Sequence, residues 1–224
     1  MTAPGPIRAV IFDFDGVLAD TERLHLAAFQ DVFSPRGWRL SEHAYVERYM
    51  GYDDAGLFAA YAEDRGMQLT DGDLAALMEE KSAAFRRRLG RGEVLYPGAI
   101  ACIGRLVDRF ALAVASGALR NEITDILFLA GVLPHFSAIV GAEDVTARKP
   151  EPEPYLTAAS RLGVDPGQCV AIEDSRWGIE SARGAGMRAV GITTTSPAEA
   201  LAHAHWIVAH LDEVTVDAIQ RLAH

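Results

Sequence analysis

Short apolar runs that alternate with helical stretches occupy the chain from Leu95 onward, and they constrain its fold most strongly. Five such runs follow one another about 20 to 30 residues apart; they are Leu112–Ala115, Ala138–Val140, Cys169–Ile172, Ala189–Ile192 and Trp206–Val208. A further run, Ala9–Phe12, is too short to stand alone and too apolar for the surface, so it must join the same sheet. The pattern predicts βαβ units, a parallel sheet and therefore an α/β protein.

A different pattern begins at Glu22, where strand signals disappear and apolar residues recur at intervals of three and four. Thr70, with Asp73 three residues later, resembles a capping box at the start of a helix. We therefore expect an all-helical insertion within an α/β core. The expected boundaries are 1–20 and 95–224 for the core domain and 21–94 for the helical domain.

Composition and charge argue against several kinds of partner. The 224 residues carry a formal net charge of -10, whereas nucleic acids and anionic membranes attract basic patches. No stretch approaches the roughly 20 apolar residues of a membrane span, and the N-terminus lacks the apolar region of a secretory signal. The two cysteines, Cys102 and Cys169, lie far apart in apolar runs, which is typical of a reducing compartment. We expect a cytoplasmic protein, a monomer or weak homodimer, with no nucleic-acid or membrane partner.

Two carboxylates follow the first apolar run. Asp13 and Asp15 stand two positions apart, on one side of an extended chain, where their charges repel unless a cation or hydrogen bonds compensate. A hard divalent metal such as Mg²⁺ is one compensation. An ordinary turn is the other interpretation that the pair alone leaves open. A calcium loop is disfavoured, because Val17, Leu18 and Ala19 stand where further oxygen ligands are needed.

Polar residues also follow three of the later runs. In open parallel sheets ligands bind at the carboxyl ends of the strands, so these residues are expected to meet; they are Ser116, Gly117, Lys149, Glu173 and Asp174. The acidic pairs would ligate Mg²⁺, and the serine, glycine and lysine would hold a phosphate dianion. Such a site fits phosphoryl transfer, in which one aspartate attacks phosphorus and the other acts as acid and base.

Four motifs, in order and in spacing, resemble those of the haloacid dehalogenase superfamily. They are Asp13-Phe-Asp-Gly-Val, Ser116-Gly, Lys149-Pro and Ile172-Glu-Asp-Ser-Arg-Trp-Gly-Ile. The helical insertion after the first motif resembles the cap of the subfamily that contains β-phosphoglucomutase and phosphoglycolate phosphatase. The resemblance covers essentially the whole chain. It implies a Rossmann-like parallel sheet core flanked by helices, with an inserted all-helical cap domain that closes over substrate.

The same resemblance implies a role for each motif residue. Asp13 would be the nucleophile that forms an aspartyl-phosphate, and Asp15 would be the general acid and base. The Mg²⁺ ligands would be Asp13, the backbone carbonyl of Asp15, Asp174 and, directly or through a water, Glu173. The phosphoryl group would be bound by Ser116, Gly117 and Lys149. Dehalogenating members lack the second aspartate, so the presence of Asp15 favours a phosphatase.

Several further residues have two interpretations each. Thr21 and His25 share one helix face where mutase-like members carry the same residue types near the cap hinge, so both are candidates for substrate binding. His25 is equally well explained as a histidine satisfied within its helix. Arg120, one helical turn after Ser116, either touches substrate, which we favour slightly, or faces solvent. Trp177 flanks the cleft or packs against a second subunit.

The segment 48–55, Arg-Tyr-Met-Gly-Tyr-Asp-Asp-Ala, bears on what accepts the phosphoryl group. Sugar-phosphate mutases carry a basic residue a few positions after the glycine to hold a second phosphate, and here Asp53 and Asp54 stand instead. Each acid would repel a phosphate by roughly 1 kcal/mol at contact in water. We therefore expect a Mg²⁺-dependent phosphatase of a small, singly phosphorylated metabolite such as a sugar phosphate or phosphoglycolate. The alternatives are a β-phosphoglucomutase-like mutase and a non-catalytic phosphometabolite-binding module.

Overall fold

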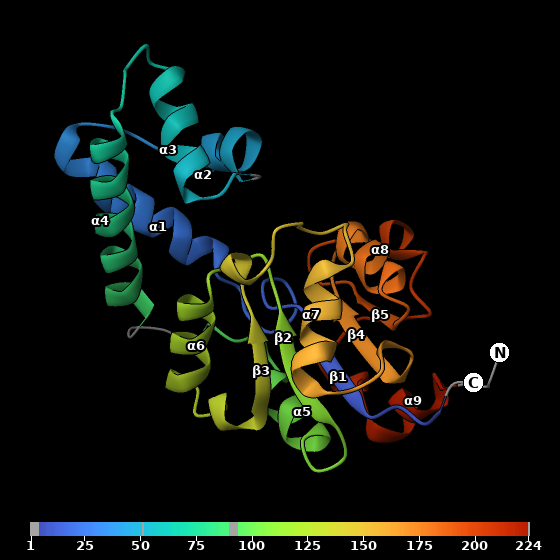
Figure 1. The fold of residues 1–224 in the computed structure, drawn as a ribbon. Coiled ribbons are helices and arrows are strands. Elements are labelled where there is room, and N and C mark those ends of the chain that lie inside the picture. The colour runs from blue at the N-terminus through green and yellow to red at the C-terminus, as the bar shows by residue number, and fades with distance from the viewer. Residues whose placement is uncertain (1–4, 51, 90–93, 224) are drawn as a thin grey trace. The chain divides into compact units, whose positions relative to one another are not determined.

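Six parallel strands form one sheet in the order β3-β2-β1-β4-β5-β6 (Figure 1). The structure is a computed structural model that describes residues 5–50, 52–89 and 94–223. The strands are β1 (Ala9–Phe12), β2 (Ala111–Ala115), β3 (Phe136–Val140), β4 (Cys169–Glu173), β5 (Arg188–Ile192) and β6 (Trp206–Val208). Each contains one of the apolar runs singled out in the sequence, so the predicted α/β fold with a parallel sheet is confirmed.

The register of β1 aligns its carboxyl end with the carboxyl ends of its two neighbours, β2 and β4. Phe12 of β1 pairs with Val114 of β2 and with Ile172 of β4. The backbone N–H of the next residue, Asp13, donates to the carbonyl of Ile172 at 2.9 Å. The chain builds outward from β1 on both sides, first through β2 and later through β4. The carboxyl end of β1 is therefore the switch point at which open parallel sheets bind ligands.

Helices flank the sheet on its faces (Figure 1). They are α5 (Ala99–Leu106), α6 (Arg120–Leu129), α7 (Glu153–Leu162), α8 (Arg176–Gly184) and α9 (Val216–Arg221). α7 packs on β1, β2 and β3, and α8 packs on β4 and β5. Ala9 and Ile11 of β1 share one buried cluster with Tyr155 of α7 and Ile179 of α8. This cluster fixes the two helices beside the strand ends.

The chain divides into two compact units, Met1–Asp20 with Val94–His224, and Thr21–Glu93, which we call the sheet unit and the helical unit. The chain leaves and re-enters the sheet unit at neighbouring points. The N–H of Asp20 donates to the carbonyl of Val94, and the N–H of Tyr96 donates to the carbonyl of Leu18, each at 2.9 Å. The sheet unit is therefore closed across the base of the insertion.

The helical unit contains α1 (Glu22–Phe33), α2 (Glu42–Ala44), α3 (Asp54–Glu63) and α4 (Asp71–Leu89). A π-helical turn, Tyr45–Tyr49, continues α2 and had no signal in the sequence. The aromatic core of the helical unit includes Phe29 and Phe58, whose ring centroids lie 5.2 Å apart. The expected capping box is confirmed, because the Asp73 N–H donates to the Thr70 hydroxyl at 3.2 Å and the Thr70 N–H donates to the Asp73 carboxylate at 2.9 Å.

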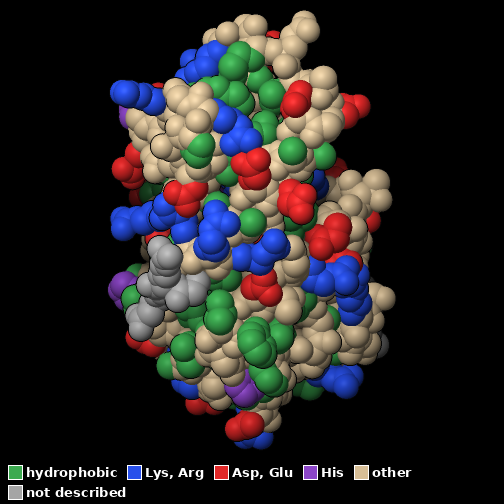
Figure 2. Space-filling view, turned by 90° about the vertical axis from the view of Figure 1, so that its left-hand side faces the viewer, with side chains coloured by type: hydrophobic (Ala, Val, Ile, Leu, Met, Phe, Trp, Pro, Cys, Tyr) green, Lys and Arg blue, Asp and Glu red, His purple; other side chains and the backbone are tan. Residues whose placement is uncertain are grey.

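Three further observations concern helix hydropathy, surface charge and the cysteines. Within residues 5–50, 52–89 and 94–223, no helix is both long enough and apolar enough to cross a bilayer. On the face shown in Figure 2, acidic and basic side chains lie interspersed. Cys102 and Cys169 are both buried free thiols, as their apolar neighbours in the sequence predicted.

Candidate active site

Asp13 stands directly after β1, at the start of a tight turn. Its carboxylate oxygen Oδ1 accepts the N–H of Phe14 at 2.7 Å, which orients the side chain against its own backbone. The turn closes where the N–H groups of Leu18 and Ala19 donate to the Phe14 carbonyl. Gly16 lies within this turn at φ 78°, a left-handed conformation that favours glycine. The buried Phe14 and the turn therefore hold Asp13 at the edge of the sheet.

Lys149 joins the carboxylates of two neighbouring strands. Its Nζ lies 3.0 Å from Asp13 Oδ1 and 2.5 Å from Glu173 Oε1, and only 14% of its side chain is exposed. Burial opposes the charged ammonium, but the two carboxylates outweigh it and raise the pKa of Lys149 above its usual value. The lysine is therefore a fixed positive charge at the end of β1. The structure thus brings together three of the predicted site residues.

Glu173 is fully buried at the end of β4 and is surrounded by donors. Its Oε1 accepts both Lys149 and, at 2.8 Å, the hydroxyl of the buried Tyr155. Its Oε2 accepts the hydroxyl of Ser175 at 3.0 Å. Ser175 in turn accepts the N–H of Gly178 at 3.0 Å and so is the N-cap of α8. These bonds fix the Glu173 carboxylate and hold the Lys149 ammonium beside it.

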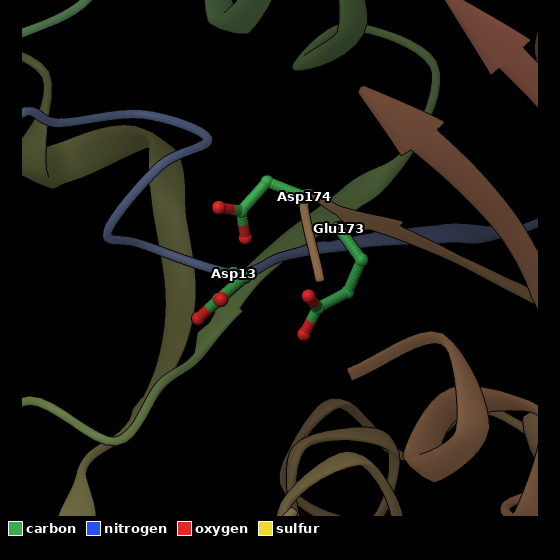
Figure 3. A group of neighbouring side chains, drawn as sticks. All are labelled: Asp13, Glu173 and Asp174. Atoms are coloured by element: carbon green, nitrogen blue, oxygen red, sulfur yellow. The ribbon is translucent and has the colours of Figure 1, made fainter. Parts of the chain in front are cut away.

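Three carboxylates converge where β1 and β4 end (Figure 3). Asp13, Glu173 and Asp174 each offer an oxygen, and these oxygens lie within 4.8 Å of one another. Burial, followed by the charge of Glu173, raises the pKa of Asp13 well above its usual range, and Lys149 offsets this only in part. Burial likewise raises the pKa of Asp174 to about 6. A cluster of buried acids whose charged forms are disfavoured fits a hard divalent cation such as Mg²⁺, which takes carboxylate oxygens.

Ser116 and Gly117 follow β2, the other neighbour of β1. Ser116 is buried, and its N–H donates to the carbonyl of Val140 at 3.0 Å. Its hydroxyl accepts the N–H of Ala118 at 3.1 Å, so the serine sits in a fixed turn. Gly117 is exposed. The register of β1 and β2 places this turn beside Asp13, at the same sheet edge as the predicted phosphate site.

Asp174 is held by a loop that follows β5. The Thr195 hydroxyl donates to Asp174 Oδ2, and this bond acts against the rise in the pKa of Asp174. The carboxylate also packs on the backbone of Gly16, where a side chain would collide with it: a Cβ there would lie 2.0 Å from Oδ2. Asp15, the predicted acid and base, precedes Gly16 in the turn and is partly exposed.

Comparison with known proteins decides which family this arrangement represents. Residues 10–192 match the family described as haloacid dehalogenase-like hydrolase. The chain belongs to that family. Fructose-1-phosphate phosphatase YqaB of Escherichia coli (strain K12) is 33% identical over 183 residues, which is 82% of this chain and 95% of that protein. The assignment confirms the resemblance carried by the four sequence motifs.

Two further relatives of this haloacid dehalogenase-like hydrolase bear on its chemistry. β-Phosphoglucomutase of Bacillus subtilis (strain 168) is 32% identical over 203 residues, covering 85% of each chain. The crystal structure of a CbbY variant from Rhodobacter sphaeroides in complex with xylulose-(1,5)bisphosphate has a TM-score of 0.83 and 26% identity. It covers 96% of this chain and 99% of that one. The hydrolase therefore shares its whole fold with a protein whose crystal structure is a complex with a sugar bisphosphate.

Arg120, predicted to touch substrate or face solvent, begins α6 of the hydrolase and forms an ion pair with Asp144. Asp144 also binds Arg161 at 2.6 Å. This second bond lowers the pKa of Asp144 to about 2, although burial of the carboxylate acts to raise that pKa. The pairing favours a structural role for Arg120. Trp177 is 56% exposed on α8, and Arg176 lies over its ring at 5.2 Å.

His25 and Thr21 lie at the start of α1 in the helical unit of the hydrolase. The His25 Nδ1 lies 2.6 Å from Nζ of Lys81, and the same Nζ pairs with Asp54 at 2.7 Å. Burial, followed by the charge of Lys81, lowers the pKa of His25 to about 3. The imidazole is therefore neutral, with Nδ1 accepting from the ammonium and the proton on Nε2. Thr21 is buried, and its carbonyl accepts the His25 N–H.

The acid pair Asp53 and Asp54 differs from our expectation. We predicted two charges that repel a second phosphate, but Asp53 caps α3 by accepting the Gly56 N–H at 2.8 Å. Asp54 is neutralised by Lys81, which is completely buried. Because Lys81 offsets the charge of Asp54, the two acids would repel a second phosphate less than two uncompensated charges would. Gly51, the glycine of the same segment, lies outside the described residues.

Three residues with unexpected contacts, two in the sheet unit and one in the helical unit, were not predicted from the sequence. Tyr155 had the pattern of a core aromatic on an amphipathic helix, and nothing local indicated its bond to Glu173. Lys81 had the pattern of a surface lysine, because its partner Asp54 is 27 residues away. Thr195 had a usable signal, since it follows β5 and the strand-end rule applied to that strand would have found it.

Proposed function

We propose that this hydrolase is a Mg²⁺-dependent phosphatase that hydrolyses a small phosphorylated metabolite through an aspartyl-phosphate on Asp13. The observation that carries the proposal is the junction of Lys149 with Asp13 and Glu173, at 3.0 and 2.5 Å, beside the carboxylate of Asp174. A fixed ammonium within an acidic cluster is suited to a phosphate dianion held together with a metal cation.

In this proposal one set of residues holds Mg²⁺ and a second set binds the phosphoryl group of the substrate. Asp13, Asp174 and the backbone carbonyl of Asp15 hold Mg²⁺, with Glu173 contributing through water. When bound, Mg²⁺ neutralises charge on the transferring phosphoryl group. Lys149 supplies a second positive charge, and Ser116 and Gly117 contribute a hydroxyl and a backbone N–H. The contact of the Lys149 ammonium with Asp13 also favours the ionised form of the nucleophilic carboxylate.

The proposed chemistry proceeds in two displacements. Both observed bonds to the Asp13 carboxylate fall on Oδ1, so we assign the attack on phosphorus to Oδ2. The P–O bond to the leaving alcohol breaks, and Asp15 donates its proton to that alcohol. Asp15 then takes a proton from water, whose oxygen attacks the phosphorus and releases Asp13 and inorganic phosphate. The two aspartates thus return to their starting protonation states.

A small sugar phosphate is the substrate class that the relatives favour, since one is a fructose-1-phosphate phosphatase and another binds a sugar bisphosphate. The second candidate is a sugar-phosphate mutase, which the Bacillus subtilis relative favours. In segment 48–55 of the helical unit, Arg48 pairs with Asp64 at 2.7 Å and Asp54 pairs with Lys81. Cations already engaged in this way are poorly placed to hold a second phosphate. This favours transfer to water.

We also propose that the helical unit, Thr21–Glu93, serves as the cap domain, with Thr21 and His25 contributing to substrate binding. A neutral His25 whose Nε2 carries the proton would donate a hydrogen bond to a substrate oxygen rather than act as a base. The proposal follows from the family resemblance and from the internal bonds of the unit.

The test is a panel of phosphate esters followed by ³¹P NMR, with and without Mg²⁺. The panel contains p-nitrophenyl phosphate, fructose 1-phosphate, phosphoglycolate, β-glucose 1-phosphate and xylulose 1,5-bisphosphate. We expect Mg²⁺-dependent release of inorganic phosphate, greatest for a singly phosphorylated sugar. Interconversion of glucose phosphates without phosphate release would instead establish the mutase. If no ester of the panel reacts, the phosphatase proposal is wrong and the non-catalytic binding module is the alternative that remains.

A further inference from the structure

Three consecutive threonines follow β5 and have no part in the proposed chemistry. Their hydroxyls donate to three different segments of the sheet unit. Thr193 reaches the carbonyl of Val208 in β6 at 3.5 Å, Thr194 bonds to the carbonyl of Gly16, and Thr195 bonds to Asp174 Oδ2. The run therefore links the last strand to the turn that carries Asp13 and to the end of β4.

The bond from Thr194 fixes the loop against the nucleophile turn. Gly16, its acceptor, is also the residue on which the Asp174 carboxylate packs, with no space for a Cβ between them. The Gly16 backbone and the Thr195 hydroxyl thus both lie against Oδ2 of Asp174. Because Asp174 is itself buried, few other orientations remain open to its carboxylate.

We propose that Thr195 is a positioning residue that orients Asp174 for metal binding. The inference rests on the proposed function, because Asp174 is a ligand of Mg²⁺ only in that proposal. Partners that hydrogen-bond to a ligating carboxylate set its orientation, and losing one typically weakens metal affinity by about 10- to 100-fold. Here the Thr195 hydroxyl uses one lone pair of Oδ2, so the remaining lone pairs of the carboxylate would be available to the cation.

The run provides its own matched variants. Thr195→Val keeps the shape of the side chain and removes only the hydroxyl, while Thr195→Ser keeps the hydroxyl and removes a methyl group. Thr193→Val makes the same change two residues earlier, where the hydroxyl donates to the Val208 carbonyl at 3.5 Å and not to Asp174. Thr195 is exposed, so none of the changes at this position disturbs a core.

The measurement is the affinity of the full-length protein for Mn²⁺, a spectroscopic substitute for Mg²⁺, by electron paramagnetic resonance without substrate. Thr195→Val should bind Mn²⁺ about 10-fold or more weakly, whereas Thr195→Ser and Thr193→Val should remain within about twofold of wild type. In parallel, the Mg²⁺ concentration for half-maximal hydrolysis of p-nitrophenyl phosphate should rise only for Thr195→Val.

Equal Mn²⁺ affinity of wild type and Thr195→Val would overturn the inference, as would an equal loss in Thr193→Val. Failure of wild type to bind Mn²⁺ at all would overturn it too. These results differ from failure of the proposed function, which would appear as a metal-binding wild type that hydrolyses none of the esters. The affinity series still judges Thr195 in that case, because it requires no turnover.

Discussion

Gly178 of α8 lies against the carboxylate of Glu173 with no room for a side chain between them. A Cβ at this position would stand 1.8 Å from the carboxyl carbon of Glu173 and no more than 2.0 Å from either oxygen. The first turn of α8 can therefore pass over the buried acid only with glycine at this position. The relationship also explains why the Ser175 hydroxyl, bonded to the Gly178 N–H, reaches Glu173 at the same time.

Gly178→Ala should force Glu173 out of its position and disturb Lys149 with it. We expect a loss of about 1–3 kcal/mol in the free energy of unfolding, the usual cost of overpacking, together with reduced phosphatase activity. Gly104→Ala is the matched control, because Gly104 is also a helical glycine but a Cβ there would meet nothing within 4 Å. Urea denaturation and steady-state kinetics measure both, and equal behaviour of the two variants would refute the relationship.

Asp13→Asn should abolish turnover while the fold persists. Loss of a nucleophile typically costs a factor on the order of 10⁴ or more in kcat. The fold should be at least as stable without metal, since the substitution removes one charge from a crowded acidic cluster. Asp217→Asn, at an exposed position of α9, controls for the same chemical change. Substantial activity in Asp13→Asn would show that another group attacks phosphorus.

Tyr155→Phe should loosen the Lys149–Glu173 junction, because it removes a donor to Glu173 Oε1 but keeps the ring beneath the lysine. We expect kcat/KM to fall about 10-fold, which is about 1.4 kcal/mol and close to the lower end of the range for a bond to a charged group. Tyr61→Phe removes a bond to the Arg39 carbonyl from an equally buried tyrosine of the helical unit and should change kcat/KM little.

A double-variant cycle distinguishes positioning from general packing. If Tyr155 acts through Glu173, the loss caused by Tyr155→Phe should nearly vanish in a Glu173→Gln background. Additive losses would show that the tyrosine hydroxyl affects activity by another route.

Protonation of His25 should make the helical unit less stable in acid. Its pKa is about 3 in the folded protein and about 6.5 in an unfolded chain, so the unfolded state binds the extra proton between these values. The resulting stability is full above about pH 6.5 and falls as the pH drops toward 3, by at most about 1.4 kcal/mol per pH unit. Urea midpoints measured between about pH 5 and 7 should fall less steeply for His25→Asn than for wild type.

Asp54→Asn should destabilise the helical unit, because it leaves the completely buried Lys81 without that carboxylate. Breaking a buried pair costs about 3–5 kcal/mol, and the lower end applies because Asp54 is 23% exposed. Replacing both partners, with Asp54→Asn and Lys81→Met, should recover much of the loss. Thermal unfolding measures the series, and a single variant as stable as wild type would contradict the assignment.

The sheet and most of the site were predictable because their signals are local. Each strand is a run of apolar residues, and a strand's position in a parallel sheet determines where the residues after it must lie. This rule brings Asp13 and Glu173 together at the ends of two adjacent strands, and it directs Lys149, in the connection after β3, to the same edge of the sheet. It depends only on strand order and direction, which short βαβ connections restrict to a few choices.

Residues whose role depends on one distant contact were not predictable. Lys81 is buried because Asp54 and His25 accept its bonds, and the sequence around it resembles an ordinary charged helix surface. Tyr155 satisfies the pattern of a core residue so well that its hydroxyl gives no separate signal. For Arg120, closeness to Ser116 in the sequence favoured a contact with substrate, and the structure adds an ion pair with Asp144 that nothing local indicated.

Two backbone hydrogen bonds join the chain segments on either side of the helical insertion. Because Asp20 bonds to Val94 and Tyr96 to Leu18, the sheet unit closes upon itself whatever lies between Thr21 and Glu93. For a loop already closed at its base, added length costs little, roughly 0.6 kcal/mol per doubling. The helical unit is therefore free to change in length and composition while the register of β1, β2 and β4 remains the same. Under the proposed function, in which the sheet unit carries the chemistry and the helical unit contacts substrate, selectivity and chemistry can therefore vary independently.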